Sequence, residues 1–110
     1  MDRDRTYLLD ILEAARLAVR YLEGVSLERF VSDTQLQDAV ARRLEIMGEA
    51  ARRMSDRTRS AHPGLPWREM VGLRNLLIHE YGAVDMTLVW QTVNAELPEL
   101  ILKLEGITGS

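Results

Sequence analysis

The sequence contains no cysteine, only two histidines and a single lysine, and it has no long run of apolar residues. Without cysteine the chain can form no disulfide and has no thiolate to bind a metal or act as a nucleophile. His62 and His79 are too few for most histidine-rich metal sites, so we predict no metal and no cofactor. A transmembrane helix needs about 20 consecutive apolar residues, and the N-terminal MDRDRTYLLD does not resemble a signal peptide. We therefore expect a cytoplasmic protein.

The net charge is −3, which argues against nucleic-acid binding through bulk charge alone. We accordingly predict no binding to DNA or to a membrane. Six arginines nevertheless fall between residues 41 and 60, where only three acidic residues oppose them. Such a segment suits phosphate binding, but genome composition explains the preference for arginine over lysine at least as well.

Apolar residues in the first half of the chain recur with the spacing of helices. From Leu8 to Leu22 they follow the i, i+3, i+4, i+7 pattern, and Gly24 ends it. After a short helical turn at residues 26–31, Ser32 and Gln35 can form a capping box. This box would open a long helix with an apolar stripe over residues 36–54, which we expect to fray into the polar segment 55–62.

The second half of the chain continues the helical pattern after the loop HPGLP. Pro66 is suited to the first position of the next helix, which should end near Tyr81–Gly82. Asp85 can cap a last helix, and Pro98 should kink it because proline has no amide hydrogen to donate.

No segment of the sequence alternates apolar and polar residues as a strand would. A chain of 110 residues is large enough for one hydrophobic core and too small for two. We therefore predict an all-α fold, a four- to five-helix up-and-down bundle that forms a single domain over residues 1–110.

The stretch RNLLIHEY, residues 74–81, places unusual side chains on a helix that otherwise reads as buried. At about 100° per residue, Arg74 lies within the apolar stripe, whereas Asn75 and His79 share a separate polar strip with Gly72. A buried guanidinium without a partner would cost several kcal/mol, so Arg74 must find an anion. Glu49 of the long helix is one candidate, and the pair would then be purely structural.

The other two residues of this stretch also have structural interpretations. His79 is placed where an imidazolium would favour the dipole at a helix C-terminus. Tyr81 can be a core residue with its hydroxyl at the rim.

Within one chain, Arg74 and His79 are about 140° apart around the helix, so they do not easily reach one small group. Two such helices, antiparallel across a two-fold axis, would bring the Arg of one chain opposite the His of the other. A homodimer of this kind could hold a phosphate between two guanidinium groups. Its imidazoles could transfer protons near neutral pH.

The same stretch matches the R-x4-H-x-Y motif and resembles the HEPN superfamily, an all-helical group. Two longer blocks, residues 37–54 and 62–100, are similar to the HepT-like branch, which supplies the toxins of HepT–MntA toxin–antitoxin modules. The similarity extends from about Tyr7 to Leu104 and includes the ELPEL around Pro98.

The resemblance implies a metal-independent endoribonuclease that acts on RNA as a homodimer, with the Arg and His of both chains in one cleft. Arg74 would bind the scissile phosphate, and His79 would act as general base or acid. Asn75 would orient the phosphate or His79. Cleavage through the RNA's own 2′-hydroxyl would leave a 2′,3′-cyclic phosphate.

The resemblance also implies a role for Tyr81 in a type VII-like toxin–antitoxin system. An MntA-like minimal nucleotidyltransferase would transfer AMP from ATP onto this tyrosine and silence the toxin. Two other interpretations remain open at this point. The chain could be a non-catalytic module that binds a nucleotide or the partner and serves as its substrate, or a plain structural bundle with a buried Arg–Glu pair.

Overall fold

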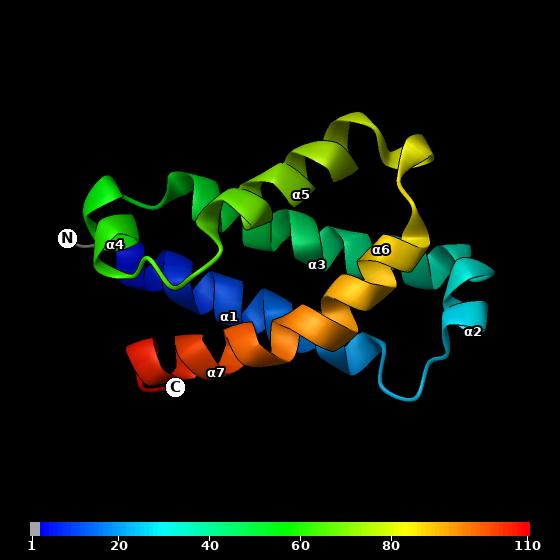
Figure 1. Ribbon diagram of the computed structural model, residues 1–110, viewed down its shortest axis with the longest axis horizontal. Coiled ribbons are helices and arrows are strands. Elements are labelled where there is room, and N and C mark those ends of the chain that lie inside the picture. The colour runs from blue at the N-terminus through cyan, green and yellow to red at the C-terminus, as the bar shows by residue number, and fades with distance from the viewer. Residues whose placement is uncertain (1–2) are drawn as a thin grey trace.

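The computed structural model describes residues 3–110, and every regular element in that range is helical (Figure 1). Residues 1–2 of the predicted domain and of the MDRDRTYLLD segment lie outside the described range. In chain order the elements are α1 (Asp4–Tyr21), α2 (Leu27–Val31), α3 (Thr34–Arg53), α4 (Asp56–Ala61), α5 (Trp67–His79), the 3-10 turn η1 (Tyr81–Ala83), α6 (Met86–Gln91), the π-helical turn η2 (Thr92–Glu96) and α7 (Leu97–Thr108). The predicted all-α class is confirmed.

The long helical segments run in alternating directions, as an up-and-down bundle requires (Figure 1). Helix α1 packs against both α3 and α7, and α5 packs against α3 at the edge of the bundle. Of the 13 residues of α5, only Met70 and Leu77 are buried. Helix α5, which carries the motif, therefore has one face on α3 and another that the other described residues leave open. Within residues 3–110, no helix is both long and apolar enough to cross a membrane.

The core lies between α1, α3 and the last helical segment. The small side chains of Ala15 and Ala18 in α1 allow the neighbouring helices to approach closely. The buried residues of the core that lie at positions of the apolar helical pattern are Leu8, Ile11, Leu12, Ala15, Ala18, Val40, Leu44, Met47, Ala51, Val93, Leu97 and Leu104. Both tryptophans are half-buried against this core. The indole N–H of Trp67 donates to the His62 carbonyl at 2.9 Å, and that of Trp90 donates to the Val25 carbonyl at 3.1 Å.

The capping box predicted at the start of α3 is wrong by one residue. Asp33 is the N-cap, and its carboxylate accepts a hydrogen bond from the Leu36 amide at 3.0 Å. Ser32 instead follows the last turn of α2, where its hydroxyl donates to the carbonyls of Glu28 and Arg29. The Ser32 side chain is thus turned back onto the end of α2, and the Asp33 carboxylate, one residue nearer to α3, accepts the capping hydrogen bond instead.

Residues 55–62, predicted to fray, form the short helix α4. Ser55 is its N-cap and accepts a hydrogen bond from the Thr58 amide. The hydroxyls of Ser55 and Thr58 both donate to the buried carboxylate of Asp4, at the start of α1. These hydrogen bonds attach the first turn of α4 to the bundle, which is why a polar segment with no buried side chain keeps a helical shape.

The boundaries of α5 and α7 also differ from the predicted ones. Pro66 precedes α5 instead of opening it, and the helix ends at His79, before Tyr81–Gly82. Asp85 caps α6 as predicted, with its carboxylate accepting from the Thr87 amide at 2.9 Å. Pro98 is the second residue of α7 and follows the π-helical turn η2. In this π-helical turn the backbone hydrogen bonds join residues i and i+5 instead of i and i+4. The change comes just before Pro98, which has no amide hydrogen to donate to the helix.

Candidate functional site

Helix α5 is held against α3 by a close contact at Gly48. A Cβ atom on Gly48 would lie 2.2 Å from the Cβ of Arg74 and 2.5 Å from the carbonyl oxygen of Met70. The backbones can approach this closely only because glycine has no side chain. The contact at Gly48 therefore sets the point along α3 beside which Arg74, a residue of α5, is placed. In the sequence, this close contact between α3 and α5 is signalled only by a glycine within a long helical pattern.

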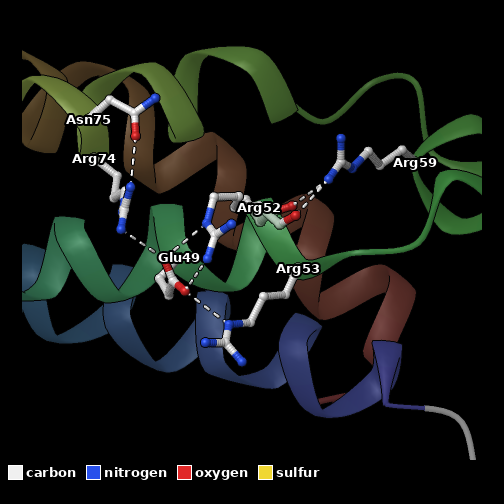
Figure 2. Close-up of polar contacts among 7 residues, drawn as sticks. Glu49, Arg52, Arg53, Arg59, Arg74 and Asn75 are labelled. Carbon is white, nitrogen blue, oxygen red and sulfur yellow. Dashed lines mark hydrogen bonds and ion pairs between the residues drawn. The ribbon is translucent and has the colours of Figure 1, made fainter.

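The Arg74 guanidinium turns toward α3 and pairs with Glu49 (Figure 2). Its Nη2 lies 3.2 Å from Oε2 of Glu49, and the Arg74 side chain is only 21% exposed. The Nη1 of Arg74 donates to the Asn75 side-chain oxygen at 2.8 Å, whereas its Nε is buried and finds no hydrogen-bond partner within residues 3–110. The sequence suggests Glu49 as a candidate anion for Arg74, and the structure shows this ion pair.

Glu49 is shared by three guanidinium groups. Arg52 donates to both of its oxygens, at 2.8 and 3.2 Å, and Arg53 donates at 2.9 Å (Figure 2). These hydrogen bonds, with a further attraction from Arg74, lower the pKa of Glu49 to about 2. One carboxylate thus neutralises only part of the charge of three arginines. A phosphate that displaced Glu49 from Arg74 would enter a region with excess positive charge.

An open hollow of about 410 Å³ adjoins this cluster, between α1, α3 and α5. Its lining includes three arginines and three carboxylates: Arg42, Arg53, Arg74, Asp10, Glu45 and Glu49. The charges of this lining balance, so the hollow attracts an anion only where one of its carboxylates moves aside.

Asn75 and His79 lie on the other side of α5, where both are exposed. Among residues 3–110, no hydrogen bond or ion pair involves the His79 side chain. Arg74 contacts Asn75 but not His79, as the predicted angular separation requires. The structure of a single chain therefore does not bring the three candidate residues to one point, and it leaves His79 available to a partner or a substrate.

Tyr81 follows α5 in the 3-10 turn η1 and contacts α3 near its beginning. Its hydroxyl donates to the carboxylate of Asp38 at 2.5 Å. Burial, together with the nearby charges of Asp38 and Glu45, raises the pKa of Tyr81 to about 12. The sequence did not reveal Asp38, since 43 residues separate it from Tyr81. Because α5 ends at His79, the orientation of Tyr81 is set by this hydrogen bond and not by the register of α5.

The Asp38→Asn variant is expected to lower the pKa of Tyr81 but to leave it above the usual value near 10. The substitution removes one nearby negative charge, whereas the burial of the ring, the larger cause, remains. Absorbance titration of tyrosinate from pH 8 to 13, with Tyr81→Phe to assign the transition, measures this shift. An unchanged transition in Asp38→Asn would contradict the Asp38–Tyr81 hydrogen bond.

Other candidate ligands do not gather into a metal site. Within residues 3–110, no group of three or more His, Asp or Glu side chains is arranged to hold a metal ion. His62 lies far from α5's motif in sequence and lines a separate hollow with Lys103.

Comparisons with known proteins agree on one family. The profile of the family described as "Ribonuclease HepT-like" matches residues 11–107. A protein of Thermococcus cleftensis named "Probable ribonuclease HepT" is 41% identical over 103 residues, which are 94% of each chain. No solved structure matches significantly.

Two further relatives are similar over almost their full length, and both are named "Putative RNase". The protein of Caldanaerobacter subterraneus is 40% identical over 107 residues, or 97% of this chain and 96% of the relative. The protein of Methanocaldococcus jannaschii is 38% identical over 101 residues, or 92% and 93%. With its motif helix intact and the family profile covering nearly all of its length, the chain belongs to the ribonuclease HepT-like family.

Proposed function

We propose that the chain is a metal-independent endoribonuclease whose active site forms between two copies of α5. The observation that carries this proposal is the division of the motif between two faces of α5. Arg74 is paired with Glu49 of α3 on one face, whereas Asn75 and His79 lie exposed on the open face. Ile78, next to this face, is an apolar side chain that is 44% exposed. A second α5 would cover it and bring its own His79 toward Arg74.

The chemistry follows from the groups that would then meet. His79 of one subunit takes the proton of an RNA 2′-hydroxyl, whose oxygen attacks the adjacent phosphorus and expels the 5′-oxygen of the next nucleotide. The imidazolium that forms on this His79 then gives the proton to the leaving oxygen. Arg74 stabilises the charge on the phosphate in place of its bond to Glu49, and Asn75 holds Arg74 in position. The product is a 2′,3′-cyclic phosphate.

Purified protein incubated with single-stranded RNA, with and without EDTA, tests this activity. We expect equal cleavage rates in both, with 2′,3′-cyclic phosphate ends identified by mass spectrometry. Cleavage that stops with EDTA, or products with 3′-hydroxyl ends, would contradict the mechanism.

We further propose that the chain is the toxin of a type VII-like toxin–antitoxin pair, and that a minimal nucleotidyltransferase silences it by adding AMP to Tyr81. The Tyr81 oxygen now donates its proton to Asp38. Once it carries a phosphate it has no proton to donate, and the new negative charge is repelled by Asp38 and Glu45. The modified side chain would leave α3 for the arginines near the cleft and obstruct RNA there.

The Tyr81→Phe variant is expected to keep RNA cleavage and growth inhibition but to escape neutralisation by the co-expressed nucleotidyltransferase. Phenylalanine preserves the ring but offers no oxygen for AMP. Tyr21→Phe, which changes a tyrosine at the end of α1, is the matched control and should remain neutralised. Equal neutralisation of Tyr81→Phe would exclude this tyrosine as the point of control.

A non-catalytic module is the second candidate, and the ion pair between Arg74 and Glu49 favours it. In that case the hollow beside Arg74 would bind a nucleotide or the adenylylated tyrosine, and the chain would act mainly as the substrate of the nucleotidyltransferase. Tight nucleotide binding without any RNA cleavage would identify this role.

A further inference from the structure

Four exposed residues form a straight stripe along α5. Arg68, Gly72, Asn75 and His79 follow the i, i+4, i+7, i+11 spacing, which places them within about 60° around the helix axis. The proposed active-site residues Asn75 and His79 therefore share one face with Arg68, which lies almost two turns before Asn75 in the helix.

Beside the N-terminal half of this stripe lies another open hollow, of about 420 Å³. It is lined by Arg59, Trp67, Arg68, Val71, Gly72 and Asn75. We call it the Arg68 hollow. Two guanidinium groups line it and no carboxylate does, whereas the hollow beside Arg74 carries three carboxylates. In a chain with a net charge of −3, this surface is suited to an anion.

Both arginines keep donors free for such an anion. Among the described residues, no hydrogen bond or ion pair involves the Arg68 side chain, which is exposed. Arg59 uses one terminal nitrogen to bind the carbonyls of Ala51 and Arg52, and its other terminal nitrogen points away from them (Figure 2). Arg59 is thus anchored at the end of α3 and still carries an unused N–H group.

The remaining lining fits a nucleotide better than a free ion. Trp67 is half-buried, and its hydrogen bond to the His62 carbonyl fixes the orientation of the ring. A Cβ on Gly72 would meet no atom within 4 Å, so the surface at the middle of the stripe is open to close approach. Positively charged grooves with an aromatic ring are the usual surface for single-stranded nucleic acid, where bases stack and arginines contact phosphates.

We propose that the Arg68 hollow binds a nucleotide of single-stranded RNA next to the cleavage point, with Arg68 and Arg59 on its phosphate and Trp67 against its base. Arg68 precedes Arg74 by six residues, which is about 9 Å along the helix. The hollow therefore holds a neighbouring nucleotide and not the scissile phosphate. The position of this subsite relative to the cleavage point rests on the proposed function, whereas RNA binding by the hollow does not.

RNA binding measured apart from cleavage tests the subsite. In a His79→Ala background, fluorescence anisotropy with a labelled single-stranded oligonucleotide gives the affinity at several salt concentrations. The slope of log K against log salt is negative, and loss of one phosphate contact reduces its magnitude by about 0.7 for a single strand. We expect Arg68→Ala to show this decrease and weaker binding at low salt. Arg29→Ala, an exposed arginine on α2 at the other end of the molecule, should change neither.

Fluorescence adds a local measurement. In a Trp90→Phe variant Trp67 is the only tryptophan, and RNA should quench its emission less strongly once Arg68 is alanine. An unchanged salt slope in Arg68→Ala, or a parent protein that binds no RNA, would overturn the subsite. If the protein cleaves RNA but Arg68→Ala leaves RNA binding unchanged, the subsite is refuted and the proposed nuclease activity is not. Arg68-dependent binding by a protein that cuts no RNA refutes the nuclease alone.

Discussion

The His79→Ala variant is expected to cleave RNA about 10²–10⁴ times more slowly than the parent, the range that a general acid or base contributes. Its free energy of unfolding should change by no more than about 0.5 kcal/mol, because His79 is an exposed side chain without a hydrogen bond among the described residues. A large loss of rate with an unchanged fold would separate a chemical role from a structural cap.

His62→Ala is the matched control, since it makes the same change at a half-buried histidine outside α5. Its backbone carbonyl, which accepts from Trp67, is retained. We expect cleavage close to that of the parent, measured as initial rates on one oligonucleotide with circular dichroism melts of all three proteins. A His79→Ala protein that cleaves as fast as His62→Ala would contradict the proposed chemistry.

The Gly48→Ala variant is expected to lose about 3 kcal/mol or more of stability, at or above the upper end of the range for overpacking a core. The added methyl group would lie 2.2 Å from the Arg74 Cβ and 2.5 Å from the Met70 carbonyl oxygen. Neither neighbour is the end of a flexible side chain, so α5 must move away from α3. Arg74 moves with it, and the fraction that still folds should also cleave RNA slowly.

Gly106→Ala makes the same substitution on α7, where the new methyl group meets no atom within 4 Å. Replacing an exposed helical glycine by alanine usually stabilises, here by up to about 1 kcal/mol. Chemical denaturation of the two variants should therefore give changes of opposite sign. A Gly48→Ala protein as stable as the parent would show that α5 does not pack on α3 as described.

The sequence predicted the helical class and the alternating bundle because buried positions of the long helices recur with period 3.6. It wrongly predicted Ser32 and not Asp33 as the cap of α3, since the choice depends on where α2 ends and on the turn toward which the serine side chain points. It also missed α4, whose first turn is held by Asp4 from 51 residues away.

The candidate site was predictable where its residues share one helix or where a buried charge requires a partner. The separation of Arg74 from His79 follows from helix geometry, and Glu49 could be named as the anion because Arg74 needed one. Asp38 and Gly48 were not predictable as site residues, because their importance comes from the way α3 and α5 pack and no spacing along the chain reveals it.

Mixed dimers of Arg74→Ala and His79→Ala subunits test most directly whether one α5 supplies the guanidinium and the other the imidazole. Each variant alone should be nearly inactive. In an equal mixture that has exchanged subunits, half of the dimers are mixed and each retains one complete Arg–His pair, so about a quarter of the parent activity should return. A mixture as inactive as its two components, with mixed dimers present by native mass spectrometry, would contradict a site shared between subunits.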